Sequence, residues 1–139
     1  MVVAKAALNR LNIELTNAYE FSMQEMLPAA SQGFIGVECL KSNEEIISIM
    51  SSINNSSEMA LANAEREFVA SLNGSCLSPI AILCNEDVYG INISAKVLSQ
   101  NGQKEIYREI KSSHENLTKD IHSLADDFIS NDAHLMILE

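Results

Sequence analysis

The chain has 139 residues, of which 47% are hydrophobic and 20% charged, and its formal net charge at pH 7 is −10. This length suits one domain, or one domain with a piece of another, and the composition is typical of a globular protein. The shortage of Lys and Arg excludes a nucleic-acid footprint and disfavours an anionic membrane. No apolar run approaches the length of about eighteen residues that a transmembrane helix needs. We therefore expect neither nucleic acid nor membrane as a partner.

Three cysteines are present, Cys39, Cys76 and Cys84, and the N-terminus lacks the basic and apolar regions of a signal peptide. An odd number of cysteines without a secretion signal indicates reduced thiols and a cytoplasmic location. The cysteines and the three histidines do not fall at zinc-ligand spacings, so no metal site is predicted. Phosphate-loop, dinucleotide-binding and nucleophile-elbow motifs are also missing from the sequence.

The first forty residues read as pieces of larger elements. Residues 2–11 are apolar from their first position and have no capping residue before them, as in an element cut in its middle. Pro28 and Gly33 then punctuate the chain, and residues 34–40 form an apolar run of strand length. This predicted strand has no hairpin partner nearby in the sequence.

Two helices are predicted between residues 43 and 72. The first begins at Asn43, a capping residue followed by two glutamates, and has an apolar face. The second follows a break at residues 54–57 and carries an apolar stripe of Leu61, Ala64, Phe68 and Leu72. Gly74 is expected as the left-handed residue after its end. The charge run that contains Glu65 is assigned to a solvated helix face.

After Cys76 the apolar spacing changes from helical to alternating, which predicts three strands over residues 80–84, 89–97 and 104–111. The expected turns are residues 85–87 and Asn101–Gly102. Ser112 and Glu115 have capping-box spacing before a last helix that ends at Asn131, with an apolar face of Leu117, Ile121, Leu124 and Phe128. The predicted fold class is α+β: a three-stranded antiparallel sheet covered by three helices, preceded by a partial segment of another α/β domain.

Cys76 lies in the polar turn between the second helix and the first strand. A free cysteine is most often buried packing material, and Cys39 and Cys84, at predicted strand positions, fit that interpretation. Cys76 is flanked instead by Gly74–Ser75 and Ser78–Pro79, where packing needs no thiol. We expect an exposed thiol there, and exposure is what cysteine reactivity requires.

Several blocks of the sequence resemble the hydroxymethylbilane synthase family, also called porphobilinogen deaminase. In order and with matching spacing they are Ala4–Leu11 (AKAALNRL), Met26–Cys39 (MLPAASQGFIGVEC), Ala64–Arg66 (AER) and Leu72–Ile80 (LNGSCLSPI). The chain departs from the family pattern where glycine is usual, at Ser31, Ser75 and Ala81, and where Gln-Val is usual, at Leu77–Ser78.

The resemblance implies a specific chemistry. Enzymes of this family join four porphobilinogen molecules into a linear tetrapyrrole, with release of ammonia, for haem and related pigments. They build it on a dipyrromethane cofactor that a thioether attaches to one loop cysteine, which by position is Cys76; a soft thiolate suits this bond. Gln32, Gly33 and Ser75 are implied to contact the cofactor, and Arg10 the substrate carboxylates.

The same resemblance implies a domain assignment. Residues 1–24 would be the tail end of the second domain, residues 25–41 a linker and strand of the first domain's sheet, and residues 42–139 the C-terminal cofactor-attachment domain. The family's catalytic aspartate and most of its substrate-binding arginines are expected outside this chain. Three arginines cannot neutralise a growing polypyrrole that carries many carboxylates.

We therefore expect a part of a transferase that is inactive alone, and self-association through the unpaired strand 34–40. The alternative left open is a non-catalytic binding or interaction module that retains the family's last domain.

Overall fold

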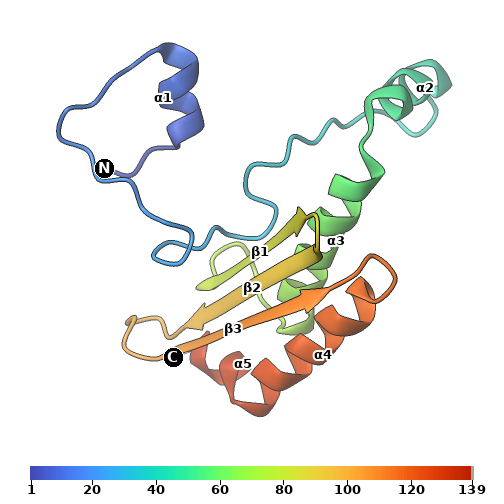
Figure 1. Cartoon of the computed structure of the whole chain (residues 1–139). Helices are drawn as coiled ribbons and strands as arrows, with labels where there is room; N and C mark the ends of the chain where they lie inside the picture. The colour runs from blue at the N-terminus through green and yellow to red at the C-terminus, as the bar shows by residue number, and fades with distance from the viewer. Residues whose placement is uncertain (139) are drawn as a thin grey trace.

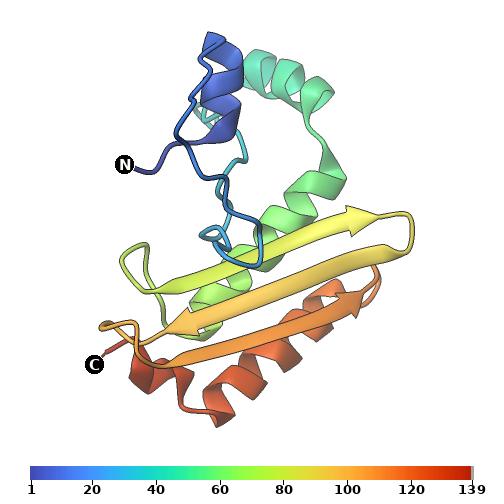
Figure 2. The same cartoon turned by 60° about the vertical axis from the view of Figure 1, so that its left-hand side comes forward.

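The computed structural model describes residues 1–138, and the buried residues of its hydrophobic core lie between Leu61 and Ile137. Three antiparallel strands form one sheet in the order β1-β2-β3. Helices α3, α4 and α5 lie on one face of that sheet (Figures 1 and 2). The bounds of these elements are β1 Ile80–Asp87, β2 Gly90–Leu98, β3 Glu105–Ser112, α3 Ser56–Ser71, α4 Leu117–Ser130 and α5 Ala133–Met136.

The sheet has a buried face because its strands alternate apolar and polar residues. The central strand β2 buries every second residue, namely Ile91, Ile93, Ala95 and Val97. Under the helices, the fully buried rings of Phe68 and Phe128 meet edge to face with centroids 5.1 Å apart, which joins α3 to α4. The predicted α+β class with a three-stranded antiparallel sheet is confirmed.

One of the three covering helices differs from the prediction. Helix α2 (Glu44–Ile53) begins as expected, because the side chain of Asn43 accepts the N–H of Ile46 at 3.2 Å. It has no buried residue, however, and Figure 1 shows it standing beyond the end of the sheet, where its apolar face cannot reach the core. The third helix on the sheet is α5, which buries Ala133 and Met136.

The first hairpin turn lies later than predicted. Residues 85–87 continue β1, and Asp87 pairs with Gly90, so the connection is only Val88–Tyr89. Asp87 Oδ1 accepts the N–H of Tyr89 at 2.7 Å, which stabilises this tight turn. Gly90 has φ +131°, and a Cβ there would lie 2.7 Å from the carbonyl oxygen of Ser112, so only glycine fits.

The predicted capping box before the last helix is wrong. Ser112 is the final residue of β3, and α4 begins only after Asn116. The Ser112 hydroxyl instead donates to Asp120 Oδ2 at 2.7 Å, across the connection from β3 to α4. The spacing was correct for a cap, but pairing with β2 extends the strand through Ser112.

The N-terminal part of the chain contributes no fully buried residue between positions 1 and 60. It contains α1 (Lys5–Leu11) and a long irregular stretch before α2. The strand predicted at residues 34–40 is not formed, and Ile35 is 95% exposed. A strand needs a partner for its backbone groups, and at the neighbouring edge of β1 the N–H of Ile82 already donates to Pro28. The assignment of residues 1–24 and 25–41 to other domains remains a prediction.

None of the helices within residues 1–138 combines the length and apolar character that crossing a membrane requires.

Candidate functional site

The turn that carries Cys76 starts from a well-defined helix end. The N–H of Asn73 donates to the carbonyl of Ala70, and the N–H of Gly74 donates to that of Val69, both at 2.9 Å. This is a Schellman motif, and its left-handed residue is Asn73 (φ 53°) rather than the predicted Gly74. Gly74 is required for another reason, because a Cβ there would lie 2.5 Å from Cδ1 of Ile80. The turn is thus packed directly against the start of β1.

Cys76 and Leu77 are the two central residues of a β-turn. The N–H of Ser78 donates to the carbonyl of Ser75 at 3.0 Å, which closes the turn. The Ser75 N–H donates to Ser78 Oγ at 2.9 Å, and the Leu77 N–H donates to Ser75 Oγ at 3.2 Å. The hydroxyl of Ser75, predicted to contact a cofactor, therefore has an internal role in the turn. These bonds hold the Cys76 backbone in one place while its side chain points outward.

The three thiols lie in different environments. Cys76 and Cys39 are exposed, whereas Cys84 is buried in β1. Burial, together with the nearby carboxylate of Glu65, raises the pKa of Cys84 to about 12, so this thiol is inert at neutral pH. The prediction that Cys39 is buried is wrong, because residues 34–40 join no sheet. The prediction of an exposed thiol at Cys76 is confirmed.

A second segment, residues 28–34, lies along the outer edge of β1; we call it the strap. The carbonyl of Pro28 accepts the N–H of Ile82 at 3.1 Å. The N–H of Ser31 donates to Glu65 Oε2 at 2.6 Å, and the Ser31 hydroxyl donates to the carbonyl of Ala62 at 3.2 Å. Phe34 packs against the core from the far end of the strap. The strap is therefore attached to both β1 and α3.

The strap carries two of the predicted site residues. Gln32 is exposed, and its side-chain oxygen accepts the N–H of Ala29 at 3.2 Å. Gly33 follows with φ +97°, a conformation that favours glycine. Strap and Cys76 turn meet the same strand, although no hydrogen bond within residues 1–138 joins Gln32 or Gly33 to Cys76. Arg10 is not brought to the site: it is exposed on α1, which Figure 1 shows far from the start of β1.

Sequence reasoning missed Glu65, which is only 1% exposed. Its two carboxylate oxygens accept the N–H of Cys84 at 2.7 Å and that of Ser31 at 2.6 Å. Burial raises the pKa of Glu65, although the two hydrogen bonds act in the opposite direction. A signal was available, because Glu65 lies four residues after Leu61 and three before Phe68, on the buried face of α3.

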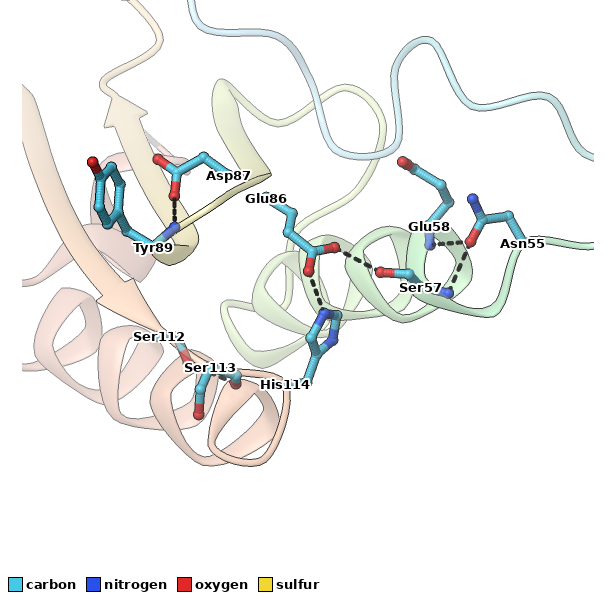
Figure 3. A network of polar contacts seen from close by, with 9 residues as sticks. All are labelled: Asn55, Ser57, Glu58, Glu86, Asp87, Tyr89, Ser112, Ser113 and His114. Carbon is cyan, nitrogen blue, oxygen red and sulfur yellow. Dashed lines mark hydrogen bonds and ion pairs between the residues drawn. The ribbon is translucent and has the colours of Figure 1, made fainter.

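A polar network ties the other end of β1 to the helices (Figure 3). Glu86 accepts a hydrogen bond from the Ser57 hydroxyl at 2.8 Å, and its other oxygen lies 2.8 Å from Nε2 of His114. The bonds from His114 and Ser57 lower the pKa of Glu86. His114 precedes α4, which begins at Leu117. The network lies at the opposite end of β1 from Cys76 and joins β1 to α3 and to the segment that precedes α4.

Neither of two depressions on the surface includes Cys76. One, of about 480 Å³, lies between β3 and α4, and its lining includes Arg108, Lys111, Asp120 and Asp127. The other, of about 260 Å³, lies between Cys39 and α2. Across residues 1–138, no group of three or more His, Cys, Asp and Glu side chains is arranged to hold a metal ion.

Two family models match the chain. The first is described as porphobilinogen deaminase, dipyromethane cofactor binding domain, and matches residues 1–48; the second is described as porphobilinogen deaminase, C-terminal domain, and matches residues 59–126. Curated relatives carry the same name. The porphobilinogen deaminase of Campylobacter hominis is 36% identical over 137 residues, which are 96% of this chain and 44% of that protein. The one from Campylobacter concisus is 32% identical over 139 residues, 99% of this chain and 45% of the relative.

A plant relative, the chloroplastic porphobilinogen deaminase of Oryza sativa, is 38% identical over 89 residues, which are 64% of this chain and 25% of that protein. The chain thus spans a little under half the length of the bacterial relatives it matches.

Proposed function

Because the chain belongs to the porphobilinogen deaminase family, we propose that it is the C-terminal part of a hydroxymethylbilane synthase. The complete transferase would join four porphobilinogen molecules into a linear tetrapyrrole and release ammonia, so the substrates are porphobilinogen and the growing polypyrrole. In this proposal Cys76 anchors the dipyrromethane cofactor by a thioether. The observation that carries the proposal is the exposed thiol at the tip of a hydrogen-bonded turn, inside the block that resembles the family.

The residues around Cys76 fit attachment of the cofactor but not its enclosure. Attachment needs an accessible sulfur on a well-ordered backbone. Residues 74–78 form a hydrogen-bonded turn that exposes the sulfur of Cys76. A dipyrromethane also carries carboxylates, which cations must hold. Residues 67–95 contain no Lys or Arg. Lys96 lies opposite Ala81 at the start of β1 but is paired with Glu105 at 3.0 Å, and Arg10 lies on α1, remote from the turn. We therefore propose that the 139-residue chain alone does not convert porphobilinogen.

The finer assignments belong to the same proposal. Gln32 and Gly33, on the strap, would line the cofactor cleft, Ser75 would shape the attachment turn, and Arg10 would bind substrate carboxylates once the remaining domains place it. Residues 42–139 would form the cofactor-attachment domain. The free state of all three cysteines supports a reducing, cytoplasmic location.

Intact mass spectrometry tests the anchor. The chain should carry the added mass of a dipyrromethane, the Cys76→Ser variant should lack it, and Cys39→Ser, which removes the other exposed thiol, should keep it. An adduct that persists in Cys76→Ser would contradict the proposal, and ammonia release from porphobilinogen by the isolated chain would contradict its inactivity.

We also propose that copies of the chain associate through residues 34–40, where Ile35, Val37 and Leu40 are exposed. Residues 1–41 contain three basic and four acidic side chains, whereas residues 42–139 contain six basic and fifteen acidic ones. Repulsion between two copies of the chain is therefore weakest near residues 34–40. Light scattering should show dimers or larger species that Val37→Lys abolishes and that Val88→Lys, a change at an exposed hairpin turn, leaves intact. A monomeric wild-type chain would contradict this.

The same exposed apolar side chains favour the second candidate function, a non-catalytic interaction module.

A further inference from the structure

We propose that Glu65 is a positioning residue that latches the strap, residues 28–34, onto the outer edge of β1. Its carboxylate receives one backbone N–H from the strand and one from the strap, and so joins segments that are far apart in the sequence. The latch follows from these contacts alone. One consequence rests on the proposed function: Glu65 would hold the Gln32–Gly33 turn in the position where it lines the cofactor cleft.

The geometry specifies a carboxylate at this position. Oε1 accepts the N–H of Cys84 at 2.7 Å, and Oε2 accepts that of Ser31 at 2.6 Å, so both oxygens must be acceptors. A carboxylate is the side chain whose two terminal atoms both accept, whereas a glutamine amide would direct its own N–H₂ at one of these donors. Glutamate at this buried site therefore matches two inward-pointing N–H groups.

Because the Glu65 carboxylate is buried, its hydrogen bonds matter for stability. A buried charge is unfavourable unless hydrogen bonds or an opposite charge compensate it. Within residues 1–138 no ion pair reaches Glu65, so its compensation comes from backbone N–H groups. Hydrogen bonds from N–H groups to an ionised carboxylate are stronger than those between neutral groups. The strap supplies one of the two, so its docking and the burial of Glu65 depend on each other.

The neighbouring contacts orient the strap but leave Glu65 at its centre. Pro28 binds the N–H of Ile82 at one end, and Phe34 packs against the core at the other. Between them Ser31 has φ 60°, a left-handed conformation that serine adopts only when its surroundings hold it there. The arrangement also occupies two outward-facing N–H groups of β1, those of Ile82 and Cys84, which blocks pairing by another strand.

Residue-resolved amide hydrogen exchange on the 139-residue chain tests the latch. In the wild-type chain the amides of Ser31 and Cys84 should be protected. In Glu65→Gln at least one of them should exchange ten-fold faster or more. Glu67→Gln, an exposed change on the same helix, is the matched control and should leave both unchanged. The amide of Ile93 in β2 should keep its protection in all three proteins, which shows that the sheet is intact.

Wild-type protection of both amides in Glu65→Gln would overturn the latch, and so would unprotected amides in the wild-type chain. A measurement on the wild-type chain covers the case in which Glu65→Gln does not fold. The amide resonances of Ser31 and Cys84 should shift together with the Glu65 carboxyl carbon as it titrates, and amides that do not follow it would overturn the proposal. None of these signals involves Cys76, so a failed anchor and a failed latch are distinguishable.

Discussion

Glu86 lies 2.8 Å from Nε2 of His114, although twenty-eight residues separate them, and this contact joins the end of β1 to the start of α4. Because hydrogen bonds from His114 and Ser57 favour the ionised carboxylate, the pKa of Glu86 is lowered from its ordinary 4.5. A lowered pKa in the folded state means that the contribution to stability is present above pH 4.5 and is lost as the pH falls through the lowered value.

Glu86→Gln should therefore lower the melting temperature slightly at pH 7, and the difference from the wild-type chain should shrink as the pH falls below 4.5. The effect should be small because both side chains are exposed. Thermal unfolding of both proteins across this range measures the difference. A difference that grows at low pH would contradict the assignment.

Glu65 should show the opposite pH dependence. Its pKa is raised mainly by burial, with a smaller contribution from Glu58, and this outweighs the two N–H bonds to the ionised form, so the folded chain holds the proton more tightly than the unfolded chain does. Relative to Glu65→Gln, the wild-type free energy of unfolding should be highest below pH 4.5 and should fall as the pH rises through the raised pKa. Urea unfolding of the two proteins between pH 4 and pH 8 measures this. A difference that is constant or increases with pH would be inconsistent with a desolvated carboxyl.

The aromatic pair in the core should dominate stability. Phe68→Ala removes a fully buried ring and its edge-to-face contact with Phe128, which should lower the free energy of unfolding by about 3–5 kcal/mol. Phe21→Ala, at an exposed position, is the control and should change it by less than about 0.5 kcal/mol. Chemical unfolding followed by circular dichroism gives both values. Similar losses in the two variants would show that the core is elsewhere.

Two glycines offer a matched test of the Cys76 turn. An alanine Cβ at Gly74 would lie 2.5 Å from Cδ1 of Ile80 and 3.1 Å from the carbonyl oxygen of Val69, whereas one at Gly36 would meet nothing within 4 Å. Gly74→Ala should cost about 1–3 kcal/mol of stability and, in chains whose Cys76 carries no cofactor, change the rate at which that thiol reacts with a thiol reagent. Gly36→Ala should do neither. Equal behaviour would mean that the turn does not depend on close packing at Gly74.

Thiol labelling checks the environments of the cysteines. At pH 8 a small disulfide reagent should modify Cys39 rapidly, and also Cys76 in chains whose intact mass shows no cofactor, because both residues are exposed. Cys84 should react only after unfolding in urea, since it is buried and its pKa is raised to about 12. Mass spectrometry of the digested protein identifies the labelled residues. Rapid labelling of Cys84 in the folded chain would refute its placement in the core.

Features that depend on neighbouring residues could be predicted from the sequence. Asn43 as a helix cap, the alternation in β2 and the turn at Asn101–Gly102 all have local causes. The exposed thiol of Cys76 was predictable for the same reason, because its flanking Gly, Ser and Pro residues specify a turn.

Features that depend on partners distant in the sequence could not be predicted. Residues 34–40 have the composition of a strand but pair with no strand of the sheet, and two outward N–H groups of the nearby β1 edge already donate to Pro28 and Glu65. Glu65 looked like part of a solvated charge run because its two N–H partners, on Ser31 and Cys84, are remote in the sequence. A carboxylate on the apolar stripe of a helix is the pattern that should have indicated a buried acceptor.

The attachment of the strap also separates residues 35–56 from the packed part of the chain on either side. Residues 35–56, including all of α2, contain no buried side chain. They connect Phe34 to α3, and both of these pack against the core. Lengthening such a tethered span changes its closure entropy only slowly. A fluorophore, an affinity tag or an inserted peptide could therefore be placed near Ile53 without disturbing the sheet. Residues 35–56 are thus a suitable insertion site for engineering the protein.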